Sequence, residues 1–140
     1  LAAVTAVDGV GEAGIVTQLA AAPAPERWIV DRSAPWSVDP LVLDGVFQAA
    51  ILWCWEELGA PSLPSSFDRL VLHGSLAGPV EARLFVRAAG RGSLRADVEL
   101  VDAQGSLVAR IEGYRATASA SLIDAFGLSP RDEAPAAAAR

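Results

Sequence analysis

Apolar and polar residues alternate along much of the chain, which is the pattern of half-buried strands. In residues 13–19, Ile15, Thr17 and Leu19 fall on one face of such a strand. The same alternation returns in four later segments, residues 67–73, 81–87, 93–101 and 107–117. Glycine, proline and aspartate lie between the last segments and favour tight turns. The pattern therefore predicts one early strand and a later antiparallel meander of four strands.

A long apolar stretch in residues 41–58 predicts a single helix. Asp39 is a residue type favoured at a helix N-cap, and Pro40 suits the first helical position. Gly59 and Pro61 are expected to end the helix. Apolar residues occupy almost every sector around its axis, so we expect the helix to be buried on nearly all sides.

The order of these elements is one strand, a long helix and four further strands. A buried helix needs a surface that surrounds it, and a curved antiparallel sheet provides one. The sequence therefore predicts an α+β protein with a single hotdog fold over residues 1–118, in which the sheet wraps the long helix. Residues 119–140 are rich in alanine and proline and are expected to form a C-terminal linker, with one or two helical turns at 121–126.

Composition excludes several classes of function. The 140 residues include 11 basic and 17 acidic side chains, a net charge of −6, which argues against a nucleic-acid interface or a polybasic membrane patch. All the basic residues are arginine and alanine is abundant, which indicates a bacterial coding bias. One Cys54 and one His73 are too few for a zinc site or an internal disulfide. We expect a cytoplasmic location and no metal, and the chain looks like part of a larger protein.

Asp44 and Gln48 are the candidate catalytic residues. They are four residues apart, so they share one face of the predicted helix and interrupt its apolar surface. A carboxylate buried there would be costly unless it is paired or stays protonated, and the glutamine can hydrogen-bond and orient it. Such a group suits general acid–base catalysis. The alternative is that Asp44 only favours the positive end of the helix dipole.

The residues around this pair resemble polyketide synthase dehydratase domains. Residues 39–50, with the letters DPLVLDGVFQAA, resemble the D-x-x-x-Q/H motif of that family. Residues 63–73, LPSSFDRLVLH, resemble the family's next strand, and residues 107–115 resemble its last strand. The resemblance extends over about residues 13–118 and keeps the order of elements.

The resemblance implies a specific reaction. A dehydratase domain of this family contains two hotdogs, of which the N-terminal one supplies a histidine and the C-terminal one an aspartate. Together they remove water from a 3-hydroxyacyl group on an acyl carrier protein and leave a trans-2-enoyl group. By this resemblance the histidine takes the α proton, Asp44 helps to protonate the departing hydroxyl, and Gln48 holds Asp44. No cofactor is implied, because the phosphopantetheine arm belongs to the carrier protein.

The chain departs from the family in one respect. The family's H-x-x-x-G-x-x-x-x-P motif is missing, and His73 lies on a predicted strand after the helix, where it is interpreted as a strand-end histidine. The chain therefore resembles the C-terminal hotdog alone and carries half of a site. Its expected partner is the N-terminal hotdog of the same megasynthase or a second copy of itself in a homodimer. We expect self-association, because an isolated half exposes an apolar surface.

Apolar side chains near the helix are candidate substrate contacts. Trp36, Phe47 and Ile51 are expected to line a tunnel for the acyl chain or the pantetheine arm, although core packing is the alternative. Cys54 lies inside the helix without a basic neighbour and is interpreted as a small buried hydrophobe.

Three functions stay open at this point. The first is a dehydratase hotdog of a bacterial polyketide or polyunsaturated fatty-acid megasynthase, which makes the chain part of a hydro-lyase. The second is a catalytically inactive, dehydratase-like module that docks, dimerises or shapes the megasynthase. The third is a self-sufficient homodimeric hotdog hydratase or thioesterase, which would need both an acid and a base.

Overall fold

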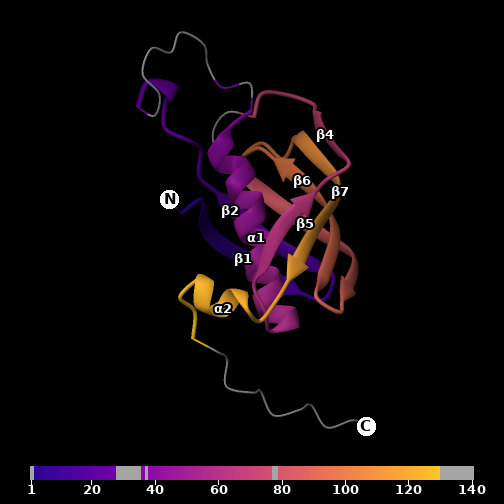
Figure 1. Cartoon of the computed structure of the whole chain (residues 1–140). Coiled ribbons are helices and arrows are strands. Elements are labelled where there is room, and N and C mark those ends of the chain that lie inside the picture. Colours follow the sequence, from indigo (N-terminus) through magenta and orange to yellow (C-terminus); the bar gives the residue numbers. More distant parts are fainter. Residues whose placement is uncertain (1, 28–35, 37, 77–78, 130–140) are drawn as a thin grey trace.

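The structure is a computed structural model that describes residues 2–27, 36, 38–76 and 79–129. A seven-stranded antiparallel sheet curves around one long helix, α1 (Pro40–Leu58), as Figure 1 shows. The predicted α+β arrangement of a helix wrapped by a sheet is therefore confirmed. The strands are β1 (Val4–Gly11), β2 (Gly14–Leu19), β3 (Ser62–Ser66), β4 (Arg69–Leu72), β5 (Val80–Gly90), β6 (Ser93–Val101) and β7 (Leu107–Ala118). Two short helical pieces complete the fold, a 3-10 turn at Pro25–Arg27 and α2 (Leu122–Ala125).

The strand order differs in part from the predicted meander. The sheet runs β1-β2-β5-β6-β7-β3, and β4 also pairs with β7. The prediction is correct for β5, β6 and β7 but wrong for β4, which lies across the sheet from β5. The strand β5 pairs with β2 and not with β4, which precedes it in the sequence. In the sheet, β7 and β6 lie between β4 and β5. Neighbours in sequence are therefore not neighbours in the sheet at this point.

Two strands were not predicted. The first, β1, is exposed over most of its length and contains Asp8, Gly9 and Gly11, so it lacks the alternation that marks a half-buried strand. The second, β3, has the sequence SLPSS, which lacks apolar–polar alternation, and it precedes residues 67–73, where the alternation predicts a strand. Both form because they pair with strong strands, β1 with β2 and β3 with β7. Hydrogen bonds and side-chain contacts with a neighbouring strand therefore stabilise β1 and β3, although their own sequences have a weak strand pattern.

The start of α1 is fixed by a buried carboxylate. Asp39 is 3% exposed, and its Oδ1 accepts hydrogen bonds from the backbone N–H groups of Leu41 (2.8 Å) and Val42 (3.1 Å). Its Oδ2 accepts from the N–H of Ala22 at 2.8 Å, which ties the chain before the helix to the helix start. Gly59 ends the helix with a φ of 68°. The predicted cap, start and end of the helix are confirmed. Asp44 lies within two turns of the Asp39 cap, which fixes the start of the helix.

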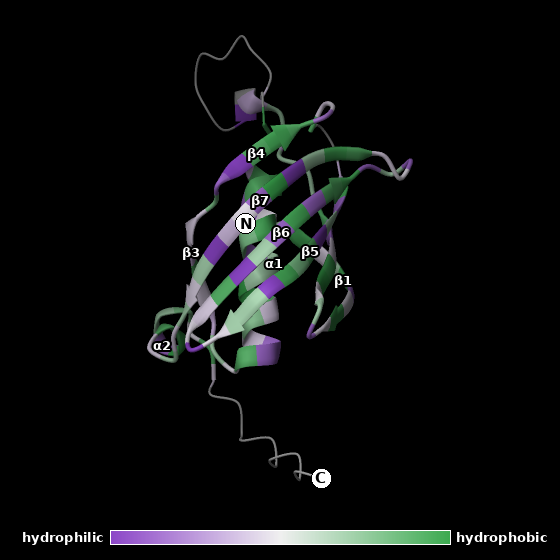
Figure 2. Ribbon diagram, turned by 90° about the vertical axis from the view of Figure 1, so that its right-hand side faces the viewer, coloured by the Kyte–Doolittle hydropathy of each residue, from purple (hydrophilic) through white to green (hydrophobic). Residues whose placement is uncertain are grey.

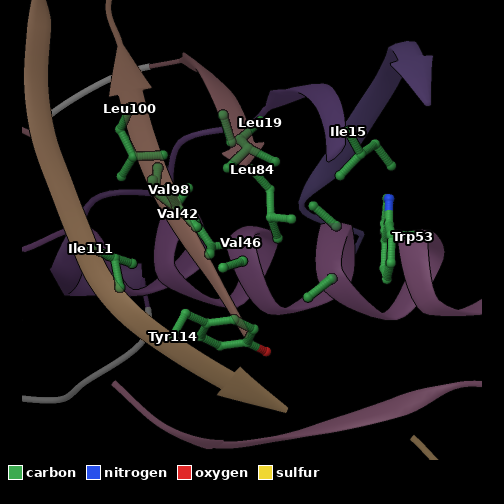
Figure 3. Packing of buried hydrophobic residues seen from close by; sticks show 14 of the residues in the cluster. Ile15, Leu19, Val42, Val46, Trp53, Leu84, Val98, Leu100, Ile111 and Tyr114 are labelled. Atoms are coloured by element: carbon green, nitrogen blue, oxygen red, sulfur yellow. The ribbon is translucent and has the colours of Figure 1, made fainter. Parts of the chain in front are cut away.

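The core lies between α1 and the concave face of the sheet. Val42, Val46 and Trp53 of the helix pack against strand residues such as Leu84 and Ile111 (Figure 3). Hydrophilic and hydrophobic residues alternate along β5, β6 and β7, which is visible as purple and green bands in Figure 2, and in β6 every second residue is buried.

One side of α1 is open, which corrects the expected burial on nearly all sides. Asp44, Leu52 and Glu56 are exposed, and Gln48 and Ile51 are half-buried. The sheet covers only the sides of the helix that face it, so the remaining side presents Asp44, Gln48 and Glu56 together with the apolar Ile51 and Leu52. Ile51 and Leu52 are therefore apolar side chains of α1 that the sheet leaves partly or fully exposed.

A carboxylate on the outer face gives the sheet a predicted pH dependence. Asp97 Oδ1 accepts from the Gly113 N–H at 2.9 Å, and Oδ2 accepts from Arg87 Nε at 2.8 Å. The bond from Gly113 and then that from Arg87 hold the pKa of Asp97 below its usual range, although partial burial opposes them. A lowered folded-state pKa stabilises the fold above the unfolded pKa of about 3.9, and that stability is lost as pH falls through the folded value.

We therefore expect Asp97→Asn to lower the free energy of unfolding by about 1 kcal/mol at neutral pH. The difference from the unmodified chain should shrink when the pH falls below about 3.9. Urea unfolding at pH 7 and pH 3 measures it, with the exposed Glu57→Gln as the control. An equal difference at both pH values would contradict the assignment.

Candidate functional site

Asp44 and Gln48 form a hydrogen-bonded pair on the open side of α1. Gln48 Nε2 donates to Asp44 Oδ2 at 2.7 Å, which one helical turn between the two residues allows. The predicted pairing of the two side chains is therefore confirmed as geometry. Their catalytic role is a separate question.

The orientation of the Gln48 amide is fixed by the start of β1. Gln48 Oε1 accepts from the backbone N–H groups of Ala3 (3.1 Å) and Val4 (3.4 Å). Because the amide oxygen faces these donors, the NH₂ group has to face Asp44. Gln48 can therefore donate to the carboxylate but cannot accept from it. The sequence did not indicate this link, because β1 was not predicted.

Asp44 itself is exposed, which corrects the expectation of a buried carboxylate. The reason is its place on the side of α1 that the sheet does not cover. A carboxyl group that is held by an amide and open on its other side can exchange a proton with a group that reaches this face. The arrangement therefore suits acid–base chemistry on a molecule bound against α1.

A shallow apolar groove adjoins the pair. It has a volume of about 290 Å³ and is lined by Gln48, Ile51, Leu52, Phe126 and Leu128. The first three residues lie on α1, and the last two follow α2 in the segment expected to be a linker. Sequence reasoning missed Phe126 and Leu128. The apolar spacing of Leu122, Ile123 and Phe126 is the signal that could have found them.

The three candidate substrate contacts occupy different places. Ile51 lines the groove beside Gln48. Phe47 stacks on Tyr114, with ring centroids 6.0 Å apart and planes inclined by 15°, so it belongs to the edge of the core. Trp36 precedes α1, and its Nε1 donates to the Pro23 carbonyl at 3.5 Å. Of these three residues, the groove brings only Ile51 together with the pair.

The two other chemically reactive side chains are elsewhere. His73 is exposed after β4, and its backbone N–H donates to the Val108 carbonyl at 2.9 Å, as a strand-end residue would. Cys54 is buried, and burial raises the pKa of its thiol. The interpretation of Cys54 as a buried hydrophobe is confirmed.

The described residues contain neither a metal-binding cluster nor a helix that could span a membrane. In that part of the chain, no group of three or more His, Cys, Asp or Glu side chains is placed to hold a metal ion. No described helix is long and apolar enough to cross a membrane.

The chain is similar to a known family and to several solved structures. Residues 6–125 match the family model described as polyketide synthase dehydratase N-terminal domain. The dehydratase-cyclase domain of ambruticin biosynthesis is 32% identical with a TM-score of 0.65, over 84% of this chain and 39% of that one. An inactive aspartate-to-asparagine mutant of the CurK dehydratase is 25% identical with a TM-score of 0.59, over 84% and 40%. No curated protein sequence matches significantly.

A solved structure from outside the dehydratases shares the fold. The PaaI protein of Escherichia coli, from its phenylacetic acid degradation operon, is 16% identical with a TM-score of 0.60. The match covers 81% of this chain and 78% of that protein. By contrast, the chain spans about two fifths of the dehydratase structures named above, at 39% and 40% of their lengths.

Proposed function

Because the chain belongs to the polyketide synthase dehydratase family, we propose that it is the hotdog that supplies the acid of a 3-hydroxyacyl dehydration site. The substrate is a 3-hydroxyacyl thioester on an acyl carrier protein, and the product is the trans-2-enoyl thioester. The hydrogen-bonded Asp44–Gln48 pair on the open side of α1 is the observation that carries this proposal. Its D-x-x-x-Q spacing supports the C-terminal hotdog of a dehydratase, whereas the matching family model is described as the N-terminal domain.

The reaction divides between two groups. A base removes the α proton, the C3–O bond breaks, and the acid gives a proton to the departing hydroxyl, so that one water leaves and a C=C bond forms. Asp44 has the position for the acid, and Gln48 holds it through the backbone of Ala3 and Val4. The aspartate-to-asparagine mutant of CurK is described as inactive, which supports a need for an aspartate in this family. The phosphopantetheine arm arrives with the carrier protein, and the step needs no metal.

The base comes from a second hotdog. His73 is exposed after β4, its backbone N–H donates to the Val108 carbonyl, and it does not line the groove beside Gln48. The relatives are more than twice as long as the matched region, which leaves room for a further hotdog in each of them. The open apolar side of α1 fits such a partner, either the N-terminal hotdog of the same megasynthase or a second copy of this chain.

The direct test follows the mass of the substrate. The chain is incubated with 3-hydroxybutyryl carrier protein, alone at high concentration and together with a histidine-bearing hotdog. We expect the loss of one water under at least one of these conditions, measured by intact-mass analysis, while butyryl carrier protein stays unchanged. No loss under either condition would contradict the proposal and favour an inactive structural or docking module.

A further inference from the structure

The apolar groove beside Gln48 has no role in the proton transfers described above. We propose that it is the subsite for the acyl chain of the substrate and that Phe126 and Leu128 determine the chain length it accepts. This inference rests on the proposed dehydration at Asp44, and it adds the segment after α2 to the site.

The position of the groove relative to the acid is the first argument. Gln48 lines the groove and donates to Asp44, so the groove begins beside the carboxyl group. In a 3-hydroxyacyl group, the carbons beyond the hydroxyl-bearing C3 are the apolar end of the molecule. A hydroxyl at Asp44 therefore leaves these carbons beside Ile51 and Leu52.

The chemistry of the lining is the second argument. Four of the five lining side chains are apolar, and the amide of Gln48 is already bonded to Asp44 and to the start of β1. A pantetheine arm carries amides and hydroxyls, which would find few partners here. A hydrocarbon chain needs none, and the volume of about 290 Å³ is near the lower end for small-molecule sites.

The third argument is that the far wall is exposed yet held in place. Leu52, Phe126 and Leu128 are 36%, 41% and 38% exposed. The backbone N–H of Ser119 donates to the Pro61 carbonyl at 3.0 Å, and that of Leu128 donates to the Ile123 carbonyl at 3.0 Å. These bonds set the segment against the end of α1 before any ligand arrives. A preformed apolar wall binds a chain with a smaller loss of entropy than a mobile one.

The test uses pantetheine thioesters of 3-hydroxybutyrate, 3-hydroxyhexanoate and 3-hydroxyoctanoate as probes. Their Kd values for the full chain are measured by calorimetry. Burial of one methylene is worth up to about a fourfold change in affinity. Because the groove is open on one side, we expect about two- to fourfold tighter binding for each added methylene. Equal Kd values across the series, or no binding of any probe, would overturn the proposal.

Two variants and a matched control locate the effect. Phe126→Ala and Leu128→Ala should each lower the ratio of the butyryl to the octanoyl Kd by about threefold or more. Phe85→Ala is the control, because Phe85 is 39% exposed on β5, outside the groove, and should leave this ratio unchanged. Leu52→Trp should fill the groove and weaken octanoyl binding more than butyryl binding. An unchanged ratio in all three groove variants would overturn the proposal.

The outcomes separate this inference from the dehydratase function. The acyl subsite is refuted, and the dehydratase function stays intact, if 3-hydroxybutyryl carrier protein loses water but the butyryl-to-octanoyl Kd ratio is unchanged in Phe126→Ala and Leu128→Ala. A ratio that responds to both residues without any water loss refutes the dehydratase function and keeps the apolar subsite. Sedimentation adds a third outcome: if Phe126→Ala abolishes self-association and also lowers the butyryl-to-octanoyl Kd ratio, the groove is also a protein contact and the subsite stands. If only self-association changes, the subsite is refuted.

Discussion

Asp44→Asn is expected to lower the rate of water loss from 3-hydroxybutyryl carrier protein by about 10²–10⁴-fold, measured with the base-supplying partner present. Asparagine has nearly the same shape as aspartate, and its carbonyl oxygen can still accept from Gln48 Nε2. It has no acidic proton to give to the departing hydroxyl. The loss should therefore fall on the rate of the chemical step, while substrate binding stays close to that of the unmodified chain.

The same variant tests the alternative that Asp44 only favours the helix dipole. In that case the rate would be unchanged, and stability would fall by about 0.3–1 kcal/mol. Thermal unfolding of both proteins supplies the control. Because Asp44 is exposed, the catalytic interpretation predicts nearly equal stability. A rate within about threefold of the unmodified chain, with substrate still bound, would remove Asp44 from the mechanism.

The helix and the pairing of Asp44 with Gln48 on one of its faces could be predicted from the sequence, because local chemistry determines them. Asp39 has the side chain that caps α1, and the later Gly59 takes the left-handed conformation that ends it. The four-residue spacing of Asp44 and Gln48 brings them to one face in any α-helix. None of these features depends on the rest of the chain.

The features that were missed depend on distant parts of the chain. The strands β1 and β3 have weak patterns of their own and form by pairing with β2 and β7. Gln48 accepts hydrogen bonds from Ala3 and Val4, which precede it in the sequence by 45 and 44 positions. A hydrophobicity pattern also cannot distinguish an apolar side that the sheet covers from one that a partner or ligand covers. The expected burial of Asp44 failed for this reason.

Gly14→Ala is expected to cause the largest loss of stability, about 3 kcal/mol or more. Gly14 has a φ of 149°, which L-residues with a side chain rarely adopt, at the start of β2. A Cβ there would overlap the backbone carbonyl of Leu84 on β5. Backbone in a sheet cannot rotate away as a side chain can, so β2 has to separate from β5 locally. Urea unfolding measures the loss.

Two glycines of the same hairpin provide matched controls. A Cβ at Gly9 or Gly11 would meet nothing within 4 Å, so Gly9→Ala and Gly11→Ala should change stability by less than about 0.5 kcal/mol. A loss at Gly14 no larger than at these positions would contradict the argument.

The effect of Gly14→Ala should also reach the site. The hairpin of β1 and β2 holds Ala3 and Val4, whose N–H groups fix the amide of Gln48. If β2 separates from β5, these donors move, and Gln48 no longer has to direct its NH₂ group to Asp44. We therefore expect dehydration to fall even at temperatures where Gly14→Ala is still folded, while Gly9→Ala keeps full activity. Unimpaired dehydration by folded Gly14→Ala would mean that Asp44 does not need this support from β1.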